Sequence, residues 1–271
     1  MITQEILIAT SVLVSAIVLI YASWSDYKTR EVSNRVWAIY APIALALSIA
    51  NLLLYDTSKL PLFGLSVGFT VGLAFLLFYS GGFGGADSKA LMCIAFALPF
   101  APNVFAPILM ASLSPVSQFI FPLTIFSNAV LFAAASGIYM IFRNIVWHTK
   151  NSKKMFATSL ATESIWKKII VLITGYKVPI GKLKAKWHIF PMEDVGESGE
   201  AELKRKLVVV PRDEGREKIV ERLSNAIQAG KIDAYVWATP GLPMLIFITL
   251  GLFVALIFGD MVWLIVRLVL G

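Results

Sequence analysis

The sequence has few cysteines, histidines and charged residues. It contains one cysteine, Cys93, so no intrachain disulfide bond can form. It contains two histidines, His148 and His188, and neither has a Cys, His or carboxylate neighbour at metal-ligand spacing, so we expect no metal site and no cofactor. Charged residues make up 15% of the 271 residues and hydrophobic residues 58%. Soluble proteins carry about 25% charged residues, so this composition indicates a membrane protein.

The few charges are concentrated in one segment. Residues 143–233 hold 18 of the 24 Lys and Arg residues and 11 of the 17 Asp and Glu residues, so the whole net charge of +7 lies there. The rest of the chain is neutral. A basic excess confined to one hydrophilic insert beside membrane spans favours contact with anionic lipid headgroups, and we expect no nucleic-acid partner.

Six apolar runs reach the length of about 20 residues that crosses a hydrocarbon layer of about 30 Å. The sequence therefore predicts an all-α polytopic membrane protein with six transmembrane helices and a small α/β insert before the last helix. The runs are 6–24, 36–54, 62–80, 90–110, 116–142 and 242–264. We expect three parts, namely residues 1–142 with five helices, the insert domain at 143–239, and residues 240–271 with the sixth helix.

Lys and Arg residues near the ends of the runs predict the orientation. With six spans, the loop at 25–35, the loop before Lys89 and the insert all fall on one side, and each contains or adjoins basic residues. This side is expected to be cytoplasmic, with both termini outside. The protein is then a multi-pass protein of the cell membrane.

The insert has patterns of regular structure. A strand is expected at 207–210, a second at 187–190, and a helix at 214–229 with one apolar face. An apolar stretch at 165–173 with Lys167 and Lys168 is typical of an interfacial helix on anionic lipid.

Two of the six carboxylates outside the insert are expected at one depth. Asp26 lies at the inner end of the first span and Asp87 at the start of the fourth, whereas Asp260 is expected near the outer interface. Two carboxylates that share a proton and a water can hydrolyse a peptide bond by aspartic proteolysis. Asp87 opens a helix, whose dipole predicts that it is the more acidic of the two. Taken alone, each Asp is more often a helix cap or a solvated residue at the boundary.

A glycine-rich string leads into Asp87. The sequence GGFGGADSKAL at 81–91 has four glycines in five residues, which lets the backbone approach a bound chain closely. A flexible connector between spans is the ordinary alternative. A phosphate-binding loop is excluded because the string does not contain GxxxxGK[ST].

These two regions resemble a known family. The strings DYKTREVSN at 26–34 and GGADSK at 84–89 are similar to the two aspartate motifs of the type IV prepilin peptidases, and most of all to their archaeal preflagellin (prearchaellin) peptidases. The family consists of polytopic aspartic proteases of the GxGD class. The resemblance implies that Asp26 and Asp87 are the catalytic pair and that Gly84, Gly85 and Ala86 form the active-site loop. It also implies cleavage of basic leader peptides from preflagellin or pilin-like precursors at the cytoplasmic face, as in assembly of the archaeal flagellum.

The sequence departs from the family pattern in places. Ala86 stands where GxGD requires Gly, and Ser33 stands where many relatives have Pro. The cysteine tetrads of many bacterial relatives are absent, so their zinc loop and N-methyltransferase activity are not expected. The string PGLP at 240–243 loosely resembles Pro-containing strings near the active sites of other GxGD proteases, although a helix start explains it equally.

Acidic residues offer candidate sites for a basic leader. Glu31 follows the first Asp, and an acidic run in the insert holds Glu193, Asp194, Glu197, Glu200 and Glu202. An ordinary solvated loop is the alternative for the run. Two other functions stay open, namely a presenilin-like protease that cuts within membrane spans and, as a non-enzyme, a small ion-coupled transporter. The sequence predicts no oligomeric state.

Overall fold

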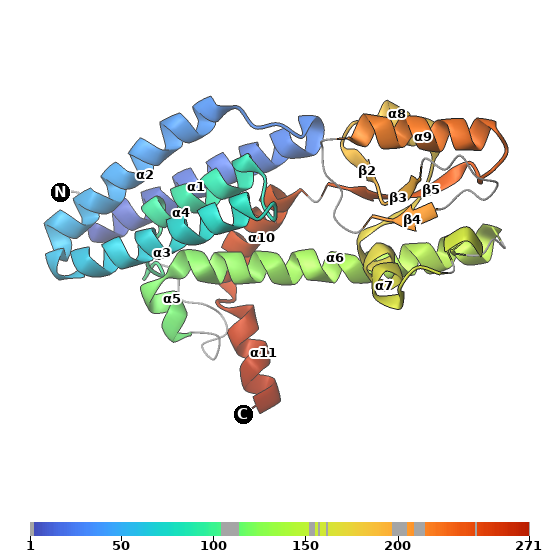
Figure 1. Cartoon of the computed structure of the whole chain (residues 1–271). Helices are drawn as coiled ribbons and strands as arrows, with labels where there is room; N and C mark the ends of the chain where they lie inside the picture. The colour runs from blue at the N-terminus through green and yellow to red at the C-terminus, as the bar shows by residue number, and fades with distance from the viewer. Residues whose placement is uncertain are drawn as a thin grey trace. The chain divides into compact units, whose positions relative to one another are not determined.

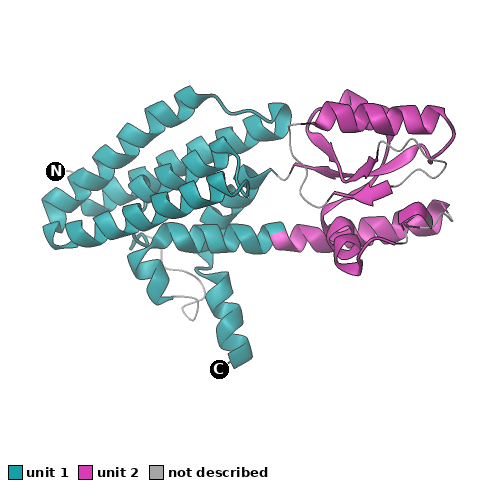
Figure 2. Cartoon of the chain, viewed as in Figure 1, with its two compact units in different colours: residues 1–133, 243–271 teal, residues 134–242 magenta. Residues whose placement is uncertain are grey.

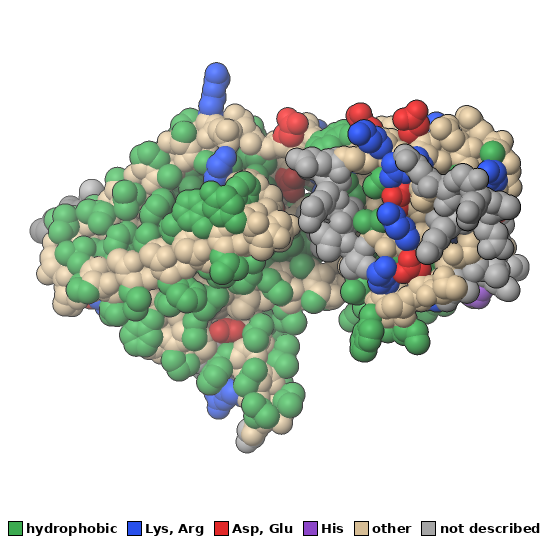
Figure 3. Space-filling view, in the orientation of Figure 1, with side chains coloured by type: hydrophobic (Ala, Val, Ile, Leu, Met, Phe, Trp, Pro, Cys, Tyr) green, Lys and Arg blue, Asp and Glu red, His purple; other side chains and the backbone are tan. Residues whose placement is uncertain are grey.

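The chain forms two compact units. The computed structural model describes residues 3–103, 114–151, 155–156, 158–160, 162–196, 205–208, 215–241 and 243–270. Unit 1 comprises Met1–Ala133 and Pro243–Gly271, and unit 2 comprises Ala134–Leu242 (Figure 2). On the face shown in Figure 3, hydrophobic side chains cover most of unit 1, whereas charged side chains gather over unit 2.

Unit 1 is a helical bundle (Figure 1). Its elements are α1 (Gln4–Thr29), α2 (Asn34–Tyr55), the short 3-10 helix η1 (Thr57–Lys59), α3 (Leu60–Tyr79), α4 (Gly85–Ala97), α5 (Pro115–Phe119), the first part of α6 (Phe121–Asn151), α10 (Met244–Ile257) and α11 (Met261–Leu270).

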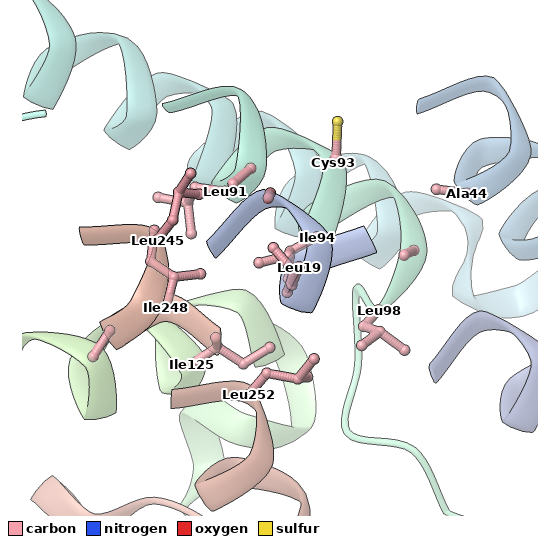
Figure 4. Close-up of a cluster of buried hydrophobic side chains, with 14 of the residues drawn as sticks. Leu19, Ala44, Leu91, Cys93, Ile94, Leu98, Ile125, Leu245, Ile248 and Leu252 are labelled. Carbon is pink, nitrogen blue, oxygen red and sulfur yellow. The ribbon is translucent and has the colours of Figure 1, made fainter. Parts of the chain in front are cut away.

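Helix α4 lies at the centre of this bundle. It packs against α1, α2, α3 and α10. Its buried residues face all sides of the helix and include Ala90, Leu91, Cys93, Ile94, Ala95 and Ala97. Figure 4 shows Leu91 and Ile94 among Leu19 of α1 and Leu245 and Ile248 of α10. A helix that is apolar all round is a buried helix, so the start of α4, which carries Asp87, is fixed by packing.

Among the described residues, four helices are long and apolar enough to cross a membrane, namely α1, α2, α3 with the turn before it, and α6. Helices α10 and α11 add a fifth crossing only when taken together. Helix α4 has 13 residues and rises about 20 Å, which is less than the layer's thickness of about 30 Å. The rest of the run expected at 90–110 lies outside the described residues from residue 104 on. Six spans are therefore not confirmed.

The last predicted span is wrong as a single helix. Between α10 and α11 the chain bends by 65°. Gly259 adopts a φ of +85° at the break, a conformation that glycine reaches without strain. The fully buried Asn128 of α6 satisfies the backbone on both sides: its Nδ2 donates to the carbonyl of Gly259 (2.9 Å), and its Oδ1 accepts from the N–H of Met261 (3.0 Å). Hydropathy does not detect a break whose freed polar groups are satisfied by a neighbouring helix.

Asp260 caps the helix after this break. Its carboxylate accepts hydrogen bonds from the N–H of Trp263 (2.9 Å) and the hydroxyl of Ser114 (2.8 Å), and the residue is 7% exposed. If the last span were one straight helix, Asp260 would simply lie near the outer interface. The break turns Asp260 into a buried cap instead.

Unit 2 contains two small antiparallel sheets, so an α/β insert before the last helices is confirmed. The first has the strand order β1 (Tyr176–Pro179), β5 (Tyr235–Pro240), β2 (Ile189–Pro191), and the second pairs β3 (Glu193–Val195) with β4 (Arg205–Leu207). In the first sheet Tyr176 lies opposite Ala238, and Ile189 lies opposite Pro240. The other elements are the later part of α6, the 3-10 helix η3 (Thr158–Leu160), α7 (Ile165–Thr174), α8 (Ile180–Ala185) and α9 (Arg216–Gln228).

The expected elements of the insert are found with shifted ends. Helix α9 confirms the helix expected at 214–229, and its Val220 and Leu223 pack on the first sheet. Helix α7 confirms the helix expected at 165–173. Strand β2 begins two residues after the strand expected at 187, and β4 begins two residues before the one expected at 207. Residues 209 and 210 lie outside the described residues.

Candidate active site

Asp26 lies in the last turn of α1 and is half-buried. Arg30 ends the helix in the left-handed conformation (φ 58°), and its backbone N–H donates to the carbonyl of Asp26 (2.9 Å). The loop that follows is held by side chains: the hydroxyls of Ser25 and Thr29 donate to the carbonyl of Glu31 at 2.7 and 3.0 Å. The first aspartate therefore sits beside a structured turn.

Asp87 is positioned by the glycine-rich loop. Gly81 turns the chain after α3 with a φ of +76°. The backbone N–H of Gly84 donates to Oδ2 of Asp87 (3.0 Å), so this carboxylate also caps α4. A Cβ added at Gly84 would lie 3.1 Å from that oxygen, so a larger residue there would crowd the carboxylate. Glycine at position 84 thus allows the backbone and the Asp87 carboxylate to approach closely.

Ala86 lies in the first turn of α4, and Arg30 is the only non-glycine residue with a positive φ among the described residues. A helical backbone is the conformation that alanine prefers. The departure from GxGD at this position therefore causes no backbone strain in this chain.

The two aspartates interact. The pKa of the Asp87 carboxyl is raised to about 7, mainly by burial and in addition by the nearby charge of Asp26, against the lowering effect of the backbone N–H groups of Gly84 and Leu245. Helix α1 packs against α4, which brings the two residues together. Burial outweighs the helix dipole and raises the pKa of Asp87 more than that of the half-buried Asp26, so the expectation that Asp87 is the more acidic of the two is wrong. Neither carboxylate forms an ion pair within the described part of the chain.

Helix α10 is a third element at this site. It begins directly after Pro243. The backbone N–H of its second residue, Leu245, donates a hydrogen bond to the Asp87 carboxylate and thereby lowers its pKa. Ser23, one turn before Asp26, bonds the carbonyl of Leu245 (2.9 Å) and the hydroxyl of Thr249 (2.7 Å). The sequence offered only the string PGLP at 240–243 as a signal for this contact.

Lys89 and Asn34 connect the two aspartate motifs. The Nζ of Lys89 donates to Oδ1 of Asn34 across 2.7 Å, although the residues are 55 positions apart. The bond joins the start of α4 to the start of α2. Both residues lie in the strings that carry the family resemblance, but the sequence assigned neither of them a role.

The acidic candidates for leader binding differ. Glu31 is exposed on the loop after α1, and no ion pair involves it among the described residues. Glu193 is completely buried and accepts two hydrogen bonds from Arg205, both 2.9 Å. Asp194 pairs with Arg222 at 2.9 Å and with Lys206 at 3.6 Å. Glu197, Glu200 and Glu202 lie outside the described residues. Glu193 and Asp194 are thus held in ion pairs, whereas Glu31 is open.

The described residues contain no group of three His, Cys, Asp or Glu side chains that could hold a metal ion. A cavity of about 550 Å³ in unit 1 is lined by residues such as Gln4, Asn51 and Asp56, but neither Asp26 nor Asp87 lines it. The groups that the described residues place at the candidate site are two carboxylates and backbone N–H groups.

Comparison with known proteins covers both units. The model of the type IV leader peptidase family matches residues 13–141, which include Asp26 and Asp87. The model of the archaeal peptidase A24 C-terminus, type II, matches residues 167–261. The preflagellin peptidase of Methanococcus voltae is 31% identical over 251 residues, which are 89% of this chain and 92% of that protein. The preflagellin peptidase of Methanococcus maripaludis is 24% identical over 253 residues, 92% of this chain and 94% of that protein.

Proposed function

The chain belongs to the type IV leader peptidase family, and on this basis we propose that it is an aspartic endopeptidase that removes the leader peptide from preflagellin precursors. The observation that carries the aspartic assignment is the interaction of two carboxylates from separate helices, neither of them ion-paired within the described chain. A transporter and a presenilin-like protease have no comparable support, because both matched families and both relatives are leader or preflagellin peptidases or their domains.

The proposed mechanism divides the roles between the two aspartates. Asp87, with a pKa of about 7, holds the shared proton and donates a hydrogen bond to the scissile carbonyl oxygen. Asp26 accepts a proton from the water, whose oxygen attacks the carbonyl carbon. The tetrahedral intermediate then collapses as Asp26 passes the proton that it took from the water to the amide nitrogen and the C–N bond breaks, which returns both carboxyl groups to their starting states. Because like charges resist ionising together, each carboxylate supports the other's role.

Glu31 is the proposed contact for the leader. The residues that precede the cut in such precursors are expected to be basic, and Glu31 presents an open carboxylate five positions after Asp26. Glu193 and Asp194 are not part of this proposal because they already form ion pairs with Arg205 and Arg222, respectively.

The active site is proposed to face the cytoplasm, with six crossings and both termini outside. Residues 90–110 would supply the fourth crossing, residues 1–142 and 240–271 the membrane part, and 143–239 a cytoplasmic domain. An even number of crossings keeps the basic segments on one side. On a Cys93→Ala background, a membrane-impermeant maleimide should label Glu5→Cys but not Lys218→Cys in intact cells. Labelling at position 218 would contradict the arrangement.

The decisive experiment compares wild type with Asp26→Asn and Asp87→Asn, purified and mixed with a preflagellin precursor. Asparagine retains an oxygen that can accept the Gly84 hydrogen bond but cannot exchange a proton at neutral pH. The cleavage rate of each variant should fall by about 10²-fold to 10⁴-fold, which is the range of general acid–base contributions. The matched control is Asp56→Asn, which removes a carboxylate that pairs with Lys59 outside the candidate site. Cleavage retained by either site variant would remove that residue from the mechanism.

A further inference from the structure

Helix α7 carries an exposed apolar stripe. Five residues at helical spacing make up this stripe: Ile165, Trp166, Ile169, Ile170 and Ile173. Ile165 is 72% and Trp166 is 75% exposed, which are high values for such large apolar side chains. An apolar patch of this kind on a folded unit marks a surface that contacts another apolar phase or partner.

The opposite face of α7 is fixed within unit 2. Val171 is fully buried in a cluster with Leu160, Met192 and Trp237. On the flanks, Lys167 pairs with Glu163 at 2.9 Å, and the Nζ of Lys168 lies 6.0 Å from the centre of the Phe156 ring. The helix therefore cannot turn its stripe inward without losing these contacts.

Two contacts hold α7 against α6. Asn144 of α6 is buried, and its Nδ2 donates to the carbonyls of Leu172 (2.9 Å) and Gly175 (2.8 Å) at the end of α7. A Cβ added at Gly137 would lie 2.7 Å from a methyl group of Ile173, so the two helices approach closely there. The C-terminal end of the stripe, at Ile173, thus lies beside residues 137–144 of α6.

This stretch of α6 is the place where its sequence changes from apolar to charged. Helix α6 is a candidate membrane span, and Arg143 is its first charged residue. Its outward apolar residues in unit 2 are Ile138, Tyr139, Phe142, Ile145 and Val146. A boundary of this kind marks the level at which a span leaves the hydrocarbon layer. Helix α7 is therefore attached at the level of the membrane surface, and its stripe adjoins an apolar face of the span.

We propose that α7 lies in the membrane interface, with the stripe inserted among the lipid acyl chains as an extension of the lipid-facing surface of α6. Figure 3 shows hydrophobic side chains protruding at the edge of unit 2 where α7 lies in Figure 1. Interfacial helices bury their apolar face about 5–10 Å deep at the headgroup boundary. Lys167 is already paired with Glu163, so the proposal assigns insertion to the apolar stripe, whereas the sequence suggested attraction to anionic lipid.

Spin labels on the full chain test this placement. Single-cysteine variants Trp166→Cys and Ile170→Cys are made on a Cys93→Ala background and reconstituted in phosphatidylcholine vesicles. Lys218→Cys and Glu221→Cys, on the exposed face of α9, are the matched controls. We expect the ratio of collisions with oxygen to collisions with a water-soluble nickel complex to be several-fold higher at 166 and 170 than at the controls. Retained precursor cleavage shows that the labelled chains are folded.

Each other result would overturn the proposal. Ratios at 166 and 170 equal to those of the controls would place the stripe in water. Low collision rates with both reagents would show that protein, such as a second copy of the chain, covers it. A high ratio that appears only when phosphatidylglycerol is added would assign the contact to the lysines rather than to the apolar stripe.

Discussion

Buried carboxylates have opposite surroundings in the two units. In unit 2, Glu193 is fully buried and hydrogen-bonded to Arg205. In unit 1, Asp87 is partly buried without an ion pair in the described chain, and burial with the neighbouring Asp26 charge raises its pKa to about 7. A carboxylate held by an arginine is committed to that partner, whereas one without a cation can exchange its proton near neutral pH. The acid-rich insert therefore contains structural ion pairs, and the acid-poor bundle contains the candidate chemistry.

The largest effect should come from breaking the pair in unit 2. Arg205→Met leaves Glu193 as an uncompensated buried charge, which typically costs about 3–5 kcal/mol. Thermal unfolding should show the loss of stability, while cleavage per folded molecule should stay unchanged. The double variant Glu193→Met with Arg205→Met removes both charges and should recover most of the stability. A single variant as stable as wild type would show that this pair contributes little.

The second prediction concerns pH. The folded-state pKa of Asp87, about 7, exceeds the ordinary aspartate value of 3.8, so between these two values the folded protein binds more protons than the unfolded chain. Stability should therefore fall as pH rises from about 4 to about 7. Asp87→Asn cannot titrate, and its unfolding midpoint should fall less over the same range. Parallel profiles for wild type and variant would contradict the raised pKa.

A smaller effect is expected at Glu31. Glu31→Gln should raise KM for a precursor with a basic leader by at most about fivefold, because exposed charge pairs contribute about 0.2–1 kcal/mol. The difference should disappear at high salt, which screens exposed charges. Asp194→Asn is the matched variant in unit 2 and should leave KM unchanged in the folded fraction. An equal rise of KM in both variants would show that the exposed Glu31 and the ion-paired Asp194 do not differ in leader binding.

The smallest effect is expected at Ala86. Ala86→Gly restores the GxGD string, but position 86 is helical, so stability should fall by less than about 1 kcal/mol. Cleavage should not improve, because the carboxylates rather than the backbone at 86 define the site. A clear gain in cleavage would show that wild type lacks a conformation that only glycine provides.

Features encoded by local pattern could be predicted from the sequence. The apolar face of α9 and the apolar run of α1 are visible in the residues themselves, and the scarcity of charges made Asp26 and Asp87 conspicuous. The pairing of Glu193 with Arg205 could not be predicted, because the partner comes from another strand of a hairpin whose register only packing selects. The break at Gly259 was missed because the polar group that stabilises it, Asn128, lies 131 residues away.

Hydrogen bonds fix helix α10 at both ends. At one end Ser23 holds the carbonyl of Leu245 beside Asp87, and at the other Asn128 holds the backbone at the break. Between them α10 approaches α6 so closely that a Cβ at Gly251 would collide with the carbonyl of Ile125. The 14-residue helix, about 21 Å long, thus fixes the distance between these two contacts. The position of an amide next to the candidate site is set partly by an asparagine one helix length away from it.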